Sequence, residues 1–211
     1  MTGFELIHRM GFEFLAETGF DLCPPFAAEW SVLVEISGPM GPEDALAEAM
    51  EAGLVVDAVI AQNEAQRAHF WALRESIPEA NKRVGSISSH DISVPVSAVP
   101  AFIARAAAAV PAGLRVNCFG HMGDGNLHYN VFPPKGKIRS DYAGQRADIA
   151  RTIFDIVAEF GGSFSAEHGV GRLKVDDLER YGDAGQLKAM HRIKAALDPV
   201  GIMNPGAVLR G

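Results

Sequence analysis

The stretch that decides the fold is Gly120-His121-Met122-Gly123-Asp124-Gly125-Asn126-Leu127-His128-Tyr129-Asn130, which lies between two segments rich in apolar and aromatic residues. Such segments are typical of strands. Asp124-Gly125 between them is a strong hairpin signal, because a type I′ turn needs positive φ at both central residues. With these two residues at the turn, we expect His121 to lie directly opposite His128, with Cβ atoms about 5 Å apart on one face.

Two opposed histidines at that separation can bind one metal ion, because each Zn–N bond is about 2.0 to 2.1 Å long. Asn130 follows His128 by two residues, so it shares this face of the strand and could reach a ligand beside the metal. The alternative is a hairpin whose histidines are only hydrogen-bonded or solvated. A second motif favours the metal site.

That motif is Ser165-Ala166-Glu167-His168-Gly169-Val170-Gly171, which follows a Gly161-Gly162 pair that ends a helix. A carboxylate added to two histidines leaves coordination positions open for water or substrate, so we predict Glu167 as the third ligand. His168 remains an unligated imidazole that is poised to accept a proton beside the cation. The glycines of the motif allow close approach of a ligand or cofactor.

Length, net charge and cysteine content limit the classes of protein to which the chain can belong. The chain has 211 residues, enough for one large domain or two small ones, and a formal net charge of −7. Without a cluster of Lys and Arg, we expect no nucleic-acid partner. The two cysteines, Cys23 and Cys118, do not make a disulfide framework, which favours a reducing compartment. The sequence contains no apolar run long enough to span a bilayer and no N-terminal signal pattern, so we expect a cytoplasmic protein.

Hydrophobic periodicity predicts the remaining elements. Helices are expected over residues 2–18, 42–52, 63–76, 97–110, 141–160 and 184–197, with a kink or restart at Pro78. Strands are expected over residues 30–36, ended by Gly38-Pro39, and over 55–61 and 88–94. This order predicts an α+β domain with a mostly antiparallel sheet covered by helices. No strand leads into a Gly-rich phosphate loop, which argues against a nucleotide-binding α/β fold.

Five segments, spread along the chain in family order, resemble the C-terminal cap half of the FAD-linked oxidases of the vanillyl-alcohol-oxidase type. They are Trp71-Ala72-Leu73-Arg74-Glu75-Ser76, His90-Asp91-Ile92-Ser93-Val94-Pro95, the hairpin Gly120–Asn130, Ala166–Gly171, and Asp198-Pro199-Val200-Gly201-Ile202-Met203-Asn204-Pro205-Gly206. The branches it resembles most are D-2-hydroxyglutarate dehydrogenase, D-lactate dehydrogenase and the glycolate oxidase flavoprotein subunit. The hairpin and the Glu-His-Gly motif are specific as a pair.

The resemblance implies oxidation of a D-2-hydroxy acid to the 2-oxo acid, with hydride passing to the flavin of FAD. It implies that His121, His128 and Glu167 bind a divalent metal, zinc or manganese, which holds the substrate hydroxyl and carboxylate as a Lewis acid. His168 would remove the hydroxyl proton.

The resemblance also implies three further contacts. Arg74 would clamp a substrate carboxylate bidentately, Asn130 would hydrogen-bond the substrate, and Asn204 would approach the flavin. From the residues alone, an ion pair of Arg74 on the helix surface with Glu75 or a nearby acid is an equal alternative.

The sequence departs from the family pattern in three places. Ser89 and Pro78 replace a lysine and a small polar residue common in the hydroxyglutarate branch, which leaves the particular diacid open, and Ala207 stands where lysine is common in the tail. We expect residues 1–211 to form one cap and substrate domain without the family's FAD-binding domain, with a flavin-approaching tail from about residue 198. An FAD-binding domain or subunit would be its partner, and the chain alone is predicted to be inactive as a dehydrogenase.

Two other functions remain open. In a stand-alone metal-dependent hydrolase, His121, His128 and Glu167 would activate water and His168 would shuttle protons, although such an enzyme has no reason to keep the 198–206 tail. In a non-catalytic metal-binding or interaction domain, the flavin-facing surface would be buried in a partner or a homodimer.

Overall fold

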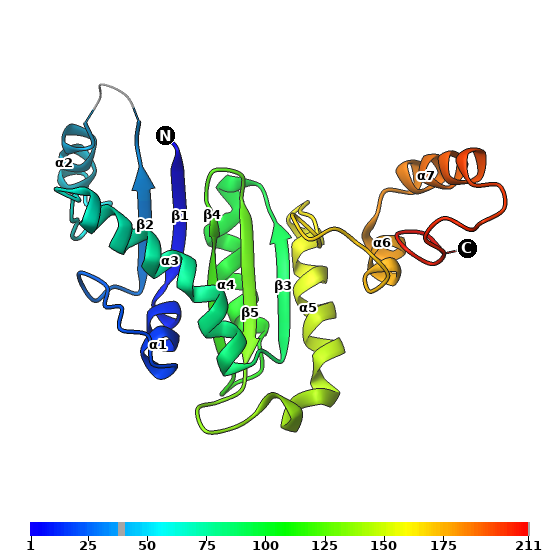
Figure 1. Cartoon of the computed structure of the whole chain (residues 1–211), viewed down its shortest axis with the longest axis horizontal. Coiled ribbons are helices and arrows are strands. Elements are labelled where there is room, and N and C mark those ends of the chain that lie inside the picture. Colours follow the sequence, from blue (N-terminus) through cyan, green and yellow to red (C-terminus); the bar gives the residue numbers. More distant parts are fainter. Residues whose placement is uncertain (38–40, 211) are drawn as a thin grey trace.

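A computed structural model describes residues 1–37 and 41–210 and shows one five-stranded sheet with helices on both faces (Figure 1). The strand order is β2-β1-β4-β5-β3, and every neighbouring pair is antiparallel. The strands are β1 (Gly3–His8), β2 (Trp30–Glu35), β3 (Ser88–Ser93), β4 (Arg115–His121) and β5 (Asn126–Phe132). The predicted α+β class with an antiparallel sheet is confirmed.

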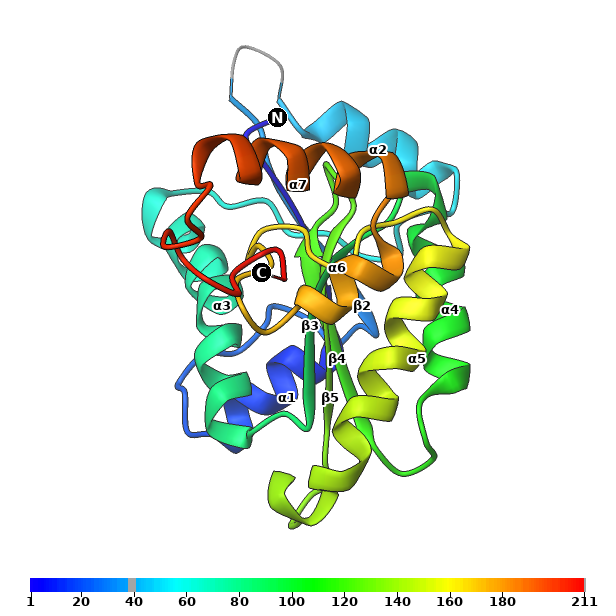
Figure 2. The ribbon, with the colours of Figure 1, turned by 90° about the vertical axis from the view of Figure 1, so that its right-hand side faces the viewer.

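Four helices form the two outer layers, as Figure 2 shows with the sheet seen edge-on. One layer contains α1 (Arg9–Glu17) and α3 (Glu64–Val84), and the other contains α4 (Val99–Ala109) and α5 (Arg146–Glu159). Beyond the β2 edge lies α2 (Glu43–Glu51), and beyond α5 lie α6 (Val175–Tyr181) and α7 (Ala184–Leu197) (Figure 1). Short 3₁₀ helices, η1 (Val96–Ala98) and η2 (Arg139–Gln145), precede α4 and α5. Among the described residues, no helix has the length and apolar character needed to cross a bilayer.

The sheet separates two hydrophobic cores, and β5 contributes to both. Leu127, Tyr129 and Val131 are buried in the larger core with residues of α4 and α5. Phe132 is buried on the opposite face with residues of α1 and α3. Successive side chains of a strand point to opposite faces, so His128 shares the α1 and α3 face with Phe132. This face carries the candidate site.

Two predicted elements need correction. Residues 2–18 are not one helix, because Gly3–His8 form β1 and only Arg9–Glu17 form α1. Leu6 and Ile7 lie in different cores, as neighbours in a central strand do. Residues 55–61 do not form a strand. Gly38-Pro39, the predicted end of the strand before them, lies outside the described residues.

The predicted restart at Pro78 is also wrong, because α3 runs as one helix through this residue from Glu64 to Val84; a kink there stays a prediction. Proline removes one backbone donor from a helix interior. Leu73 and Ile77 before Pro78 and Ala80 after it are all buried in the same core, and this packing holds the two halves together. Asn63, the first residue of the predicted helix, is the N-cap, since its side chain accepts a hydrogen bond from the N–H of Gln66.

Candidate metal centre and active site

The hairpin turn is longer than the sequence predicts. His121 pairs with Asn126, and His128 pairs with Phe119. The prediction that the two histidines lie directly opposite each other is therefore wrong, because the register of the strand pair differs from the predicted one by two residues. The side chain of Asp124 accepts a hydrogen bond from the N–H of Asn126, 3.0 Å away, which stabilises the wider turn. A register shift of two keeps the strand face unchanged. Both histidines therefore still lie on one face, with ring centroids 6.4 Å apart.

One position in the turn can be occupied only by glycine. Gly125 has φ 76°, and a Cβ there would lie 2.0 Å from the carbonyl oxygen of Val94. The same loop receives a second support, because the carbonyl of Gly125 accepts a hydrogen bond from the N–H of Val94. The end of the hairpin is thereby fastened to the end of β3, close to the loop that carries Glu167.

His121, His128 and Glu167 converge on one point. Nε2 of His121 lies 3.3 Å from Oε1 of Glu167, and Nε2 of His128 lies 3.9 Å from Oε2. One ligand atom from each residue lies within 4.8 Å of the other two. Burial lowers the pKa of His128, which keeps its imidazole neutral and able to donate a lone pair. Two imidazole nitrogens and one carboxylate fit a divalent metal such as zinc or manganese.

Asp91 on β3 positions the loop that carries Glu167 and His168. Its Oδ2 accepts hydrogen bonds from the backbone N–H groups of both residues, each at 2.8 Å, and its Oδ1 accepts one from the Asn126 side chain. Burial by itself would raise the pKa of Asp91, but these hydrogen bonds, with His168 contributing most, lower it below its usual value. Asp91 has no predicted role. The signal that could have identified it is a charged residue in the middle of a predicted strand.

His168 lies beside the three candidate ligands. Its ring stacks on that of His128, with centroids 5.9 Å apart and an interplanar angle of 26°. Its Nδ1 lies 3.7 Å from Oδ2 of Asp91, and its side chain is 65% exposed. An exposed imidazole in this position is accessible to a small molecule bound at the cluster.

Arg74 forms the ion pair with a nearby acid that was one of its two expected roles, but the acid is Glu5 of β1 and the pair is buried rather than on the helix surface. Its Nε and Nη2 each donate to Oε2 of Glu5 at 2.8 Å, and its guanidinium lies over the ring of Phe119. The other oxygen of Glu5, Oε1, lies 2.6 Å from Nδ1 of His121. Glu5 has no predicted role. Residues 2–18 were predicted as a helix, so the position of Glu5 on a buried face of strand β1 was not expected.

The two predicted asparagine contacts lie in different surroundings. Asn130 is 8% exposed, and its Oδ1 accepts a hydrogen bond from the N–H of His90 at 3.3 Å. Asn204 is exposed, with φ 47°, in the tail after α7. This tail, drawn in red, lies apart from the hairpin in Figure 1. It contacts the loop after Glu167 through a hydrogen bond from the N–H of Val208 to the carbonyl of Gly171. The approach of Asn204 to a flavin stays a prediction.

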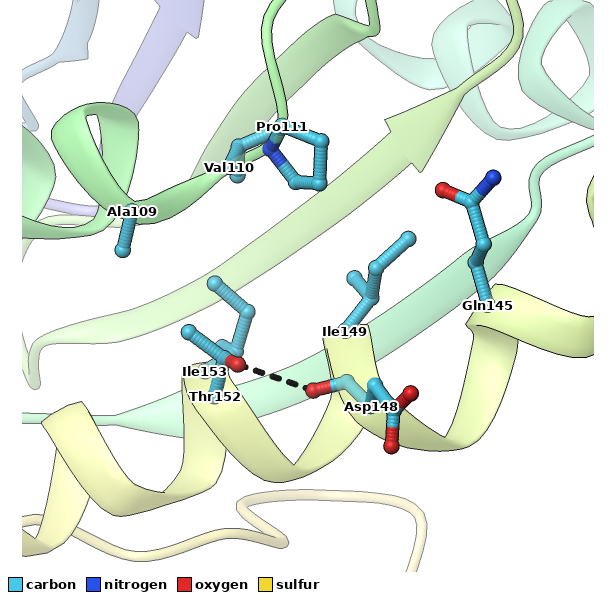
Figure 3. Close-up of a pocket in the computed structure, with 8 residues that line it drawn as sticks. All are labelled: Ala109, Val110, Pro111, Gln145, Asp148, Ile149, Thr152 and Ile153. Atoms are coloured by element: carbon cyan, nitrogen blue, oxygen red, sulfur yellow. Dashed lines mark hydrogen bonds between the residues drawn. The ribbon is translucent and has the colours of Figure 1, made fainter.

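Two hollows of the surface can be compared with the candidate centre. An open one of about 340 Å³ adjoins the candidate centre and is lined by residues that include Phe4, Glu5, His121 and Asp124. The other, about 200 Å³, lies between α4 and α5 above Ile149 and Ile153 (Figure 3). It contains none of the predicted site residues. Of these two hollows, the one beside His121 is lined by a predicted site residue.

Comparison with known proteins gives the family of the chain. Residues 1–208 match the family "FAD linked oxidases, C-terminal domain". The chain is 40% identical over 162 residues to the D-2-hydroxyglutarate dehydrogenase of Stutzerimonas stutzeri (strain A1501), covering 75% of this chain and 35% of that protein. It is 34% identical over 194 residues to the mitochondrial D-2-hydroxyglutarate dehydrogenase of Bos taurus, covering 89% and 35%. The chain spans about a third of the length of these relatives. Because the family match covers almost the whole sequence, the chain belongs to the C-terminal domain family of the FAD linked oxidases.

Proposed function

We propose that this chain is the substrate- and metal-binding part of an FAD-dependent dehydrogenase or oxidase of D-2-hydroxy acids. The observation that carries the proposal is the convergence of His121, His128 and Glu167 beside the free imidazole of His168. The names of the relatives point to a 2-hydroxy acid, with D-2-hydroxyglutarate as the first substrate to test. Residues 1–211 act as one domain in this proposal.

The two cofactors supply different chemistry. A zinc or manganese ion held by His121, His128 and Glu167 would act as a Lewis acid toward the substrate hydroxyl. FAD, bound mainly by an FAD-binding domain or subunit, would accept the hydride, with Asn204 of the tail approaching the flavin. The chain's own residues bind and orient the acid and move its proton.

His168 is the proposed base. It is the exposed imidazole next to the cluster, and Asp91 fixes its backbone through the 2.8 Å hydrogen bond to its N–H. The same carboxylate lies beside Nδ1, which orients the ring. His168 removes the hydroxyl proton of the substrate as the carbon gives up its hydride.

Arg74 and Asn130 are the proposed substrate contacts. Glu5 takes one donor from each of Nε and Nη2 of Arg74, so the two donors of Nη1 and the second donor of Nη2 are the ones proposed to bind a substrate carboxylate. Asn130 shares the strand face of His128 and offers its amide to the bound acid. A positive guanidinium is needed here because the whole chain carries a net charge of −7.

The test combines this chain with a flavin half. The FAD-binding part of the Stutzerimonas stutzeri relative is mixed with or fused to this chain, and dye reduction is followed with a panel of D-2-hydroxy acids. We expect reduction that requires both parts and a divalent metal, and that is lost in His168→Ala. Metal-dependent ester or amide hydrolysis by this chain without flavin would instead establish the hydrolase alternative.

A further inference from the structure

Glu5 joins the two halves of the candidate site. It is 5% exposed on β1, and each of its carboxylate oxygens has a different partner. Oε2 accepts from Nε and Nη2 of Arg74, and Oε1 lies 2.6 Å from Nδ1 of His121. A buried carboxylate needs such partners, because leaving its charge unpaired in the protein interior is costly.

The contact with His121 decides where the imidazole carries its proton. An ionised carboxylate only accepts hydrogen bonds, so Nδ1 of His121 must be the donor in the 2.6 Å contact. The lone pair of the neutral ring is then on Nε2, and Nε2 is the atom that lies 3.3 Å from Glu167. Carboxylates that accept from the far nitrogen of a metal-binding histidine fix its tautomer and ring orientation in this way.

We propose that Glu5 is a positioning residue that keeps the proton of His121 on Nδ1 and presents its Nε2 lone pair to a metal. The use of that lone pair for a metal rests on the proposed function, whereas the location of the proton does not. Arg74 holds the carboxylate in place from the opposite side, so one buried side chain fixes both the predicted acid clamp and a predicted metal ligand.

The guanidinium makes an isosteric test informative. Arginine only donates hydrogen bonds, so in Glu5→Gln the amide oxygen must face Arg74. The amide NH₂ then faces Nδ1 of His121 and donates to it. This arrangement removes the proton from Nδ1 and places it on Nε2, where it blocks the ligand atom. Glu5→Gln therefore inverts the tautomer while changing neither the size nor the shape of the side chain.

The neighbouring strand supplies a matched control. Glu35 on β2 pairs with α3 in the same way, accepting from Nε and Nη2 of Arg67, and it also accepts from the indole N–H of Trp71. It lies opposite Gly3 of β1 and has no histidine partner among the described residues. Glu35→Gln thus removes a strand-to-α3 carboxylate without touching His121.

The experiment has two arms on this chain. Long-range ¹H–¹⁵N NMR of the metal-free protein at pH 8 reports which nitrogen of His121 carries a proton, and zinc affinity is measured by competition with a chromophoric chelator. We expect a protonated Nδ1 in the wild type and in Glu35→Gln, and an unprotonated Nδ1 in Glu5→Gln. Zinc affinity should fall about 10- to 100-fold in Glu5→Gln and stay unchanged in Glu35→Gln.

The two arms separate this proposal from the proposed function. An unprotonated Nδ1 in the wild type overturns the role of Glu5, and this measurement needs no variant, so it stands even if Glu5→Gln fails to fold. Equal zinc affinity in Glu5→Gln and Glu35→Gln also overturns it. A wild type that binds no zinc refutes the metal site of the proposed function, while the NMR arm still decides where Glu5 places the proton.

Discussion

Oε1 of Glu167 lies 3.3 Å from Nε2 of His121, although the two residues come from different parts of the fold. His121 ends β4, and Glu167 lies in the loop between α5 and α6. A backbone bridge between Ser93 and Ser163 ties the start of this loop to β3, and the side chain of Asp91 holds the N–H groups of Glu167 and His168. The integrity of the centre therefore depends on a residue that is not itself a predicted ligand.

Asp91→Asn should destabilise the loop and the protein together. The variant keeps an oxygen for the N–H groups of Glu167 and His168, but its amide NH₂ then meets the donor of Asn126. Hydrogen bonds to a charged group are worth about 1.5–3 kcal/mol, and the unfolding free energy should fall by about that amount. Urea denaturation measures the change. Zinc affinity should also fall in Asp91→Asn, because the loop carries Glu167, and should stay unaltered in Asp155→Asn, a change of the α5 carboxylate that accepts from Tyr181.

Arg74→Lys should spare metal binding and weaken the binding of the acid. Lysine keeps the positive charge beside Glu5. It lacks the planar guanidinium, whose several N–H groups can bind Glu5 and a substrate carboxylate at the same time. The Kd of a D-2-hydroxy acid, measured by titration calorimetry on the metal-loaded chain, should rise about tenfold or more. A Kd equal to that of the wild type would remove Arg74 from the substrate site.

The stability of the protein should fall as the pH is lowered from about 6.5 to about 4, with His90 as a main cause. Burial lowers the pKa of His90 from 6.5 to about 4. Between these values the unfolded chain binds a proton that the folded chain excludes, so stability is complete above the unfolded pKa and declines below it. The loss amounts to roughly 3 kcal/mol.

His90→Gln isolates this contribution. Nδ1 of the neutral imidazole donates to the Tyr129 carbonyl and Nε2 accepts from the Ser88 hydroxyl, and an uncharged amide retains polar contacts without a titrating group. The unfolding free energy of the variant should depend less steeply on pH between 7 and 4.5 than that of the wild type. Identical slopes would show that His90 titrates normally in the folded protein.

The two cysteines should react at very different rates with a thiol reagent. Cys23 is exposed, whereas Cys118 is buried in β4 and its burial raises the pKa of the thiol. Native protein should show one fast-reacting thiol, which Cys23→Ser removes, and the second should appear only after unfolding. Fast modification of Cys118 in the native state would contradict the packing of the larger core.

Local signals in the sequence predicted the hairpin, the order of most elements and the three converging side chains. The turn residues and the Glu-His-Gly motif are short-range patterns. The predicted register of the hairpin was wrong by two residues, but side chains two residues apart share a strand face, so both histidines still lie on the predicted face. The antiparallel sheet followed from the same signals.

The supporting residues were not predictable by the same route. Glu5 and Asp91 act through contacts between distant segments, and the helix-like spacing of Phe4, Ile7 and Phe12 hid β1, whose pairing with β4 is long-range. The strand predicted at 55–61 failed for a related reason: its apolar residues, such as Val56, are exposed and have no partner strand in the described part of the chain. Propensity alone does not reveal tertiary partners.

The central claim is that His121, His128 and Glu167 bind one divalent metal. Zinc content of the purified chain, measured by inductively coupled plasma mass spectrometry after loading and dialysis, tests it most directly, with His191→Ala on the exposed face of α7 as the matched control. We expect about one zinc per chain in the wild type and in His191→Ala, and none in His128→Ala or His121→Ala. Full zinc content in His128→Ala would contradict the account.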